Sequence, residues 1–293
     1  MFLGFPYLIY GIDSRICSLL CARAYLRTSR RLWLHGGRLQ PDDILASLTS
    51  KFTLDSCASR QFCRSIRSRD FRTKVTVSSE MRLLEYRPDG EFAVTENLPD
   101  NEDLEYAILS HTWGSEEVIF KDLVDGTGGD KDGYEKLRFC ANRARHNGLR
   151  YFWVDTCCID KSNQVELNEA IISMFRWYRN AARCYVYLSD VLSRKRKRKR
   201  KQSEPWEGAF RESRWFKRGW TLQELLAPAS VEFFTLESQR LGDKRSLEQP
   251  IYEITKIAMS ALRGTDLSQF DADERFKWAE SRETTREEDW AYC

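Results

Sequence analysis

The sequence predicts an α/β domain in which a parallel sheet is flanked by helices, with extra helices toward the C-terminal end. Short apolar runs of strand length alternate with segments of helical periodicity, and the connections between them are short. Such alternation is typical of a parallel sheet that is covered on both faces. The 293 residues are 42% hydrophobic, which is sufficient for one sizeable core or two small ones.

Residues 1–80 differ in composition from the rest of the chain. They contain 13 Lys/Arg against 6 Asp/Glu, and much of this stretch is rich in arginine and serine. A targeting presequence has this composition. The alternative is a non-native extension ahead of a true start at Met81, where MRLLEY begins a well-patterned segment. We favour the extension, and under either interpretation we expect residues 1–80 to be poorly ordered.

The first elements of the domain are a hairpin, a strand and a helix. Residues 81–86 and 91–94 predict a small hairpin around a Pro-Asp-Gly turn. Residues 105–110 (EYAILS) form a short apolar run, which predicts a buried strand. Apolar residues then recur at helical spacing over 137–144, and Asn147-Gly148 ends that helix.

The second half of the sheet follows in the same pattern. Residues 149–155 (LRYFWVD) predict a strand, and Asn163 with Glu166 resembles a capping box for the next helix. That helix has one apolar stripe, formed by Ile171, Met174, Phe175 and Tyr178. Residues 184–188 (CYVYL) and 231–235 (VEFFT) predict two more strands.

Three further segments complete the chain. Residues 214–228 (RWFKRGWTLQELLAP) predict a turn and a short helix that carry Glu224. Two amphipathic segments follow at about 251–262 and 273–282. The final EEDWAYC contains no capping or turn signal, so we expect the domain of residues 81–293 to be truncated in the middle of an element.

Charge is distributed unevenly along the chain. The net charge is +3, but residues 194–201 are eight consecutive Lys/Arg, and outside residues 1–80 and this run there are 26 basic against 38 acidic residues. That acidic balance argues against a nucleic-acid-binding protein. The basic run predicts a solvated loop, because eight like charges repel one another, with a nuclear import signal as the alternative.

The cysteine and hydropathy patterns indicate a reduced, cytoplasmic protein. The count of nine is odd, and several cysteines lie inside apolar segments, which suits free thiols better than disulfides. The nine are Cys17, Cys21, Cys57, Cys63, Cys140, Cys157, Cys158, Cys184 and Cys293. No CxxC pair recurs among them and there are three histidines, so we predict no metal site. No apolar run reaches the length of a membrane span.

Polar residues follow the predicted strands at the points where a ligand site is expected. Ser110 and His111 end the first strand, Asp155 ends the second, and Ser189-Asp190 follow the third. In a parallel sheet these carboxyl ends meet at one edge, where ligands collect. The segment with Glu224 comes next, so we expect its carboxylate to join this edge.

Five ordered segments carry a recognisable signature. They are YAILSHTWG (Tyr106–Gly114), FWVDTCCIDK (Phe152–Lys161), MFRWYRNAARCYVYLSDV (Met174–Val191), RGWTLQELLAP (Arg218–Pro228) and ESRETTREEDWAYC (Glu280–Cys293). In this order they resemble the HET domain, the heterokaryon incompatibility family of filamentous fungi. The resemblance covers residues 81–293, and members often begin near MRLLEY.

The resemblance implies a module of fungal non-self recognition that triggers cell death when incompatible cells fuse. The family is similar to TIR domains, which have a flavodoxin-like α/β fold, and some TIR domains cleave NAD+ between nicotinamide and ribose. Their glutamate lies in a Trp-Cys-x-x-Glu-Leu segment, which residues 220–225 resemble with threonine in place of cysteine. The resemblance thus implies a TIR-like NAD+ glycohydrolase with Glu224 as the catalytic carboxylate and NAD+ as substrate rather than bound cofactor.

Seven further residues form the predicted substrate site. Trp113 and Trp220 are candidate platforms for the nicotinamide or adenine ring, with core packing as the alternative. Arg218 is a candidate for the pyrophosphate, or it pairs with a carboxylate. Gly114 would allow the backbone to approach a phosphate. The full set is Ser110, His111, Trp113, Gly114, Asp155, Arg218 and Trp220.

Three alternatives compete with a catalytic glutamate. Thr221 and Glu224 fit a capping box in which the carboxylate bonds back to its own helix. His111 with Cys157 or Cys158 would suit a thiol hydrolase. A non-catalytic module of the same pathway, working by self-association into a homo-oligomer or through an unknown sensor or partner protein, would need no reaction at all.

Overall fold

The computed structural model describes residues 80–87, 90–96, 98–99, 104–193, 206–286 and 289, which belong to the unit Ser78–Cys293. The predictions about residues 1–79, the tip of the first hairpin and the basic run at 194–201 lie outside these ranges. Four of the described cysteines, Cys140, Cys157, Cys158 and Cys184, are free and buried, as the sequence predicts.

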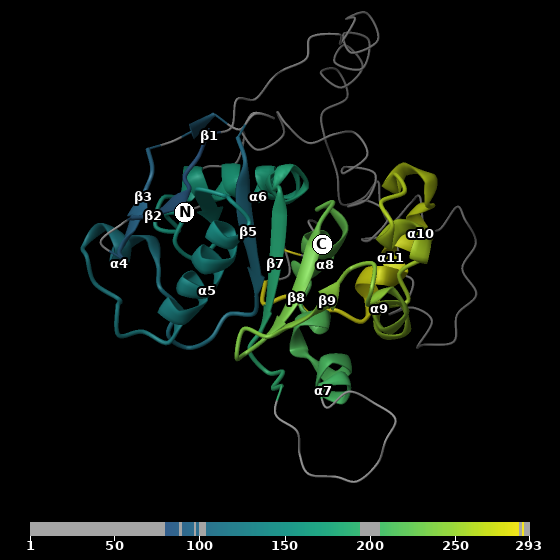
Figure 1. The fold of residues 1–293 in the computed structure, drawn as a ribbon. Coiled ribbons are helices and arrows are strands. Elements are labelled where there is room, and N and C mark those ends of the chain that lie inside the picture. Colours follow the sequence, from purple (N-terminus) through teal and green to yellow (C-terminus); the bar gives the residue numbers. More distant parts are fainter. Residues whose placement is uncertain are drawn as a thin grey trace, which may run out of the picture. The chain divides into compact units, whose positions relative to one another are not determined.

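A seven-stranded mixed sheet forms the centre of the described residues, in the order β3-β2-β6-β5-β7-β8-β9 (Figure 1). A separate two-stranded pair joins β1 (Glu80–Met81) to β4 (Leu98–Pro99). The strands of the main sheet are β2 (Leu84–Tyr86), β3 (Phe92–Val94), β5 (Tyr106–His111), β6 (Tyr151–Trp153), β7 (Arg183–Leu188), β8 (Val231–Thr235) and β9 (Arg240–Asp243). The predicted hairpin and all four predicted strands are therefore confirmed.

The prediction of a parallel sheet is correct for the centre and wrong for the edges. β5 pairs in parallel with β6 and β7, and β7 pairs in parallel with β8. β2 joins β6 antiparallel, and β9 joins β8 antiparallel. The chain between β8 and β9 is only four residues long, and a connection that short can make a hairpin but not a parallel crossover.

The four parallel strands stand in the order β6-β5-β7-β8, so the first strand in the chain is flanked by the second and the third. The direction of the crossovers reverses between β5 and β7. In open α/β sheets such a reversal opens a crevice at the carboxyl ends of the strands, where ligands bind. Ser110 and His111 lie at this point, because they end β5.

Helices cover both faces of the sheet, as predicted (Figure 1). On one face α5 (Gly133–His146) inserts Phe139 among the rings of Tyr187 and Phe234 at centroid distances of 5.0 Å. On the other face α6 (Gln164–Asn180) places Trp177 5.7 Å from Trp153. Also on this second face, α8 (Thr221–Leu226) contacts both α6 and β5. The Glu224 helix is thereby held against the strand that carries Ser110.

The N-terminal cap of α6 is confirmed in part. The Asn163 side chain accepts hydrogen bonds from the amides of Val165 and Glu166. The Glu166 carboxylate does not return to Asn163, because it accepts instead from the Asp160 amide at 2.7 Å and from Arg82. Half of the predicted capping box is present.

Replacing Asn163 with alanine should lower the free energy of unfolding by about 1 kcal/mol, because two amide donors at the start of α6 lose their acceptor. Chemical denaturation of the purified chain measures the change. An Asn163→Asp variant keeps the acceptor oxygen and should stay near wild type. A loss of the same size in both variants would contradict the capping role.

The remaining helices lie between strands along the chain or follow β9. α4 (Phe120–Val124) precedes α5, and α7 (Glu207–Glu212) and the 3-10 turn η1 (Arg214–Lys217) precede α8. The extra C-terminal helices are confirmed as α9 (Glu248–Thr255), α10 (Met259–Leu262), the 3-10 turn η2 (Leu267–Gln269) and α11 (Ala272–Glu280). The first amphipathic segment is divided between α9 and α10, because Lys256 adopts a left-handed conformation at φ 58°.

Candidate functional site

The carboxylate of Glu224 is buried at the carboxyl end of β5. It accepts a hydrogen bond from the Ser110 hydroxyl, and the same hydroxyl oxygen accepts from the Trp215 indole at 2.8 Å. Tyr178, from α6, lies beside Glu224 and donates its own hydroxyl to the Leu109 carbonyl at 3.0 Å. The Glu224 residue is only 7% exposed. Three separate segments therefore hold one acidic group between them.

Burial raises the pKa of Glu224 to about 8. The Ser110 hydrogen bond opposes this shift, the Asp155 charge adds to it, and Arg218 and Arg282 also oppose it. A carboxyl group with a pKa near neutrality, held beside cations at the edge of a sheet, is typical of functional sites.

The capping alternative for Glu224 is wrong. α8 begins at Thr221 with Trp220 as its N-cap residue, and no side chain makes a capping hydrogen bond there. The Thr221 hydroxyl donates to the carbonyls of Trp215 at 2.6 Å and Arg218 at 2.8 Å. The Glu224 side chain reaches across to β5 and does not fold back onto its own helix.

Trp113 lies in the loop after β5, beside Asp155. Its indole donates to Asp155 at 2.9 Å, and its ring is contacted by Lys161 at 3.7 Å and by Arg218 at 4.8 Å. The Trp113 residue is 41% exposed, although two cations lie on its ring. The core-packing alternative for Trp113 is therefore wrong.

His111 belongs to a second cluster of charges, directly beside the first. Its Nε2 lies 3.5 Å from Glu117 and its Nδ1 lies 3.8 Å from Asp155. Burial alone would raise the pKa of Glu117, but the contact with His111 and the hydrogen bond from Lys136 outweigh burial and lower it to about 2. Glu117 is thus a permanent anion, and Asp155 connects this cluster to Trp113.

Two of the predicted substrate-binding residues have their hydrogen-bond donors engaged by carboxylates of the chain. The Gly114 amide donates to Glu117 at 2.5 Å, and a Cβ added at Gly114 would meet its nearest atom at an ordinary 3.5 Å. The Trp220 indole donates to Asp289 at 3.0 Å. The other five, Ser110, His111, Trp113, Asp155 and Arg218, are connected with one another and with Glu224 by the contacts described above.

Several members of the site are absent from the sequence prediction. They are Glu117, Lys161, Tyr178, Trp215 and Arg282. Arg282, which follows the C-cap residue of α11, donates to the Arg218 carbonyl at 2.9 Å and to the Thr221 hydroxyl at 2.8 Å. Lys161 and Arg282 lie inside the FWVDTCCIDK and ESRETT motifs. Membership of these motifs is the sequence signal that could have identified both residues as site members.

The thiol-hydrolase alternative is not supported by the structure. Cys157 and Cys158 are buried, and burial raises the pKa of Cys158 to about 12 and that of Cys157 well above its usual value. A nucleophilic thiol needs the opposite shift. His111 instead faces the carboxylates of Glu117 and Asp155.

The other polar positions after strands have structural roles. The Asp190 carboxylate accepts from the Ser213 hydroxyl at 2.8 Å and from the Arg214 amide at 2.9 Å, which fixes the start of η1. Asp160 accepts from both the amide and the hydroxyl of Ser162. Within the described ranges, no group of three or more His, Cys, Asp or Glu side chains is arranged to hold a metal ion.

Fold and site together define an α/β domain with a buried carboxylate at the switch point of its parallel strands. Residues 106–201 match the family "Heterokaryon incompatibility protein (HET)", and this region of the chain belongs to that family. The chain is 56% identical over 214 residues to the vegetative incompatibility protein HET-E-1 of Podospora anserina. That match covers 72% of this chain and 16% of HET-E-1, and no solved structure matches the chain.

In the part of the chain that the structure describes, every helix is too short or too polar to cross a lipid bilayer.

Proposed function

We propose that the chain acts in heterokaryon incompatibility as a cell-death effector that hydrolyses NAD+ at the nicotinamide–ribose bond, with Glu224 as its catalytic carboxylate. The family match and the similarity to a vegetative incompatibility protein support the biological role. One observation carries the chemical part: Glu224 meets Ser110 at the carboxyl edge of the sheet instead of capping its own helix.

The chemistry of the reaction suits a single carboxylate. When the bond between C1′ of the ribose and the ring nitrogen breaks, its electron pair leaves with neutral nicotinamide and positive charge develops on the sugar. A carboxylate beside that carbon stabilises the oxocarbenium-like state. Water then adds to C1′ and releases a proton, which gives ADP-ribose.

The positive charge of the nicotinamide ring would affect the protonation state of Glu224. With a pKa of about 8, this group holds its proton at neutral pH in the closed site. The cationic nicotinamide ring of NAD+ would favour the ionised form when it lies beside the carboxylate. Substrate binding would therefore create the charge that the reaction needs.

The groups around Trp113 suit the rest of the dinucleotide. The ring of Trp113 is a platform for a flat base, and Arg218 and Lys161 beside it are cations for the pyrophosphate. Because Glu224 is buried, the side chains that bury it must move before a substrate can reach the carboxylate.

The strand order supports a relation to the flavodoxin-like and TIR folds. The parallel strands β6-β5-β7-β8 stand in the chain order second, first, third, fourth. Flavodoxin-like sheets begin with the same order and bind their ligand at the same reversal. The proposed site lies at this position.

Incubation of the purified chain with NAD+ tests the proposal, with nicotinamide and ADP-ribose separated by chromatography. We expect both products in equal amounts. Absence of nicotinamide release over hours, from a folded preparation at micromolar concentration, would contradict an NAD+ hydrolase.

Replacing Trp113 with alanine should raise KM for NAD+ by about tenfold and change kcat less, because the platform contacts the base and not the breaking bond. Trp113→Phe is the matched control, since it keeps a ring and loses only the indole donor to Asp155. Initial rates over a range of NAD+ concentrations separate the two constants. Equal KM values in all three proteins would remove Trp113 from the substrate site.

A non-catalytic self-association module is the second candidate function. α6 exposes two apolar side chains seven positions apart, Val165 at 68% and Ile172 at 74%, which places both on one helix face. A preparation that forms homo-oligomers through this face, and releases no nicotinamide, would favour this candidate. In either case we propose a cytoplasmic protein that works with a sensor or partner protein.

A further inference from the structure

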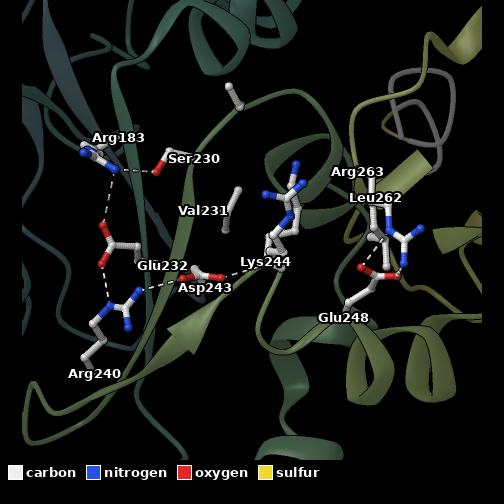
Figure 2. A pocket seen from close by; sticks show the side chains of 12 residues that line it. Arg183, Ser230, Val231, Glu232, Arg240, Asp243, Lys244, Glu248, Leu262 and Arg263 are labelled. Atoms are coloured by element: carbon white, nitrogen blue, oxygen red, sulfur yellow. Dashed lines mark hydrogen bonds and ion pairs between the residues drawn. The ribbon is translucent and has the colours of Figure 1, made fainter. Parts of the chain in front are cut away.

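A pocket lies at the end of the parallel strands opposite to Ser110. It has a volume of about 370 Å³ and lies at the start of β7 and β8, beside β9 and α10 (Figure 2). Arg183 is the first residue of β7 and Val231 the first of β8. A pocket of this size accommodates a small organic molecule.

The charges that line this pocket do not balance. Arg183, Arg240, Lys244, Arg245 and Arg263 face three carboxylates, those of Glu232, Asp243 and Glu248. The carboxylates are already paired, and Figure 2 shows the two paired groups on opposite sides of Lys244. Arg240 pairs with Glu232 at 2.7 Å and with Asp243 at 2.9 Å, and Arg263 pairs with Glu248 at 2.8 Å. Arg183 lies 4.0 Å from the same Glu232 carboxylate.

The surplus consists of two adjacent cations. Within the described ranges, neither the Lys244 ammonium nor the Arg245 guanidinium has a carboxylate within 4.0 Å. Lys244 is only 8% exposed, and a buried cation ordinarily has a counter-charge. Burial lowers the pKa of Lys244 to about 8, which is the expected result of that missing anion.

Lys244 also has a hydrogen-bond donor left over. Its ammonium donates to the carbonyls of Leu225 at 3.1 Å and Pro228 at 2.8 Å, at the end of α8. An ammonium has three donors, and the described part of the chain provides no third acceptor. A structural role at the end of α8 accounts for two of its donors but not for the missing negative charge.

We propose that this pocket binds a small molecule that carries a phosphate group. The phosphate is placed against Lys244 and Arg245, where an ammonium and a guanidinium fork supply complementary donors. The organic part lies against the apolar side chains of Val231, Ala229 and Leu262. This site is separate from the proposed NAD+ site and does not depend on it.

Titration calorimetry of the full chain with ribose 5-phosphate, at constant ionic strength, tests the proposal. We expect saturable binding of ribose 5-phosphate and none of unphosphorylated ribose. Arg245→Ala should weaken binding about tenfold, because one charge-assisted contact is lost, and Lys244→Met should weaken it further. Arg138→Ala on α5, which removes an exposed arginine far from the pocket, should leave the affinity unchanged.

Three outcomes would overturn the proposal. The first is no saturable binding of ribose 5-phosphate, and the second is wild-type affinity in Arg245→Ala. The third is an equal loss in Arg138→Ala, which would indicate attraction by the overall charge. Arg245 is exposed and its substitution leaves the core intact, so this variant decides the matter even where Lys244→Met fails to fold.

Discussion

Replacing Glu224 with glutamine should reduce kcat for NAD+ cleavage by about a thousandfold, because the neutral amide cannot stabilise positive charge that develops on the ribose. The substitution keeps the size of the side chain and an oxygen that accepts from Ser110. Binding of NAD+ through Trp113 and Arg218 should change little, so KM should stay within a few-fold. The quantity to measure is nicotinamide release under saturating NAD+.

Glu253→Gln is the matched control for this loss. Glu253 lies on α9, pairs with Arg211 at 2.6 Å and is exposed, so the same chemical change there should leave turnover unchanged. Circular dichroism of both variants establishes that each is folded. Turnover at the wild-type rate in folded Glu224→Gln would remove Glu224 from the mechanism, while leaving the family assignment untouched.

The central strands and the main helices could be predicted because their signals are local. Residues 106–109 and 184–188 are continuous apolar runs, and α6 has both a cap at Asn163 and an apolar stripe. Each of these patterns lies within one element, so no knowledge of the tertiary structure is needed to recognise it. The position of Ser110 and Glu224 at one edge followed from these elements and the rule for parallel sheets.

The edge strands and the details of the site could not be predicted in the same way. β9 reads RLGD, which has no apolar alternation, and it is a strand only because it continues a short hairpin from β8. The Ser110–Glu224 bond joins residues 114 positions apart, and Trp215 bonds to Ser110 across 105 positions. Which side chains meet across such separations in the sequence depends on how the helices pack on the sheet. That packing cannot be inferred from the local patterns of a single sequence.

The same limit explains why the sequence alone leaves the capping alternative open for Thr221 and Glu224. The spacing T-x-x-E fits a capping box, and nothing in the local sequence distinguishes it from a helix whose glutamate points toward the sheet. Burial decides between these two orientations of the glutamate. Leu222 and Leu225 are buried, and Glu224 points inward with them. Ser110 then supplies the hydrogen bond that the cap would have provided.

Burial of Glu224 also predicts a strong pH dependence of stability. Its pKa is about 8 in the folded chain, above the value of about 4.3 expected when unfolded. The folded state therefore binds this proton more tightly, and the resulting stabilisation is full below pH 4 and lost as pH rises through 8. Relative to Glu224→Gln, the wild type should lose about 1.4 kcal/mol per pH unit between pH 5 and 8, on the order of 4 kcal/mol in all.

Urea denaturation of the two proteins at pH 5, 6, 7 and 8 measures this difference. The comparison cancels other titrating groups, because they are shared by both chains. Among the described residues, Lys244 is the other buried group with a pKa near 8. Its lowered pKa acts in the opposite direction, above this range. Unfolding free energies that run parallel in the two proteins would mean that Glu224 is ionised and hydrated in the folded chain. The carboxylate would then face solvent in an open cleft, and its burial beside Ser110 would be wrong.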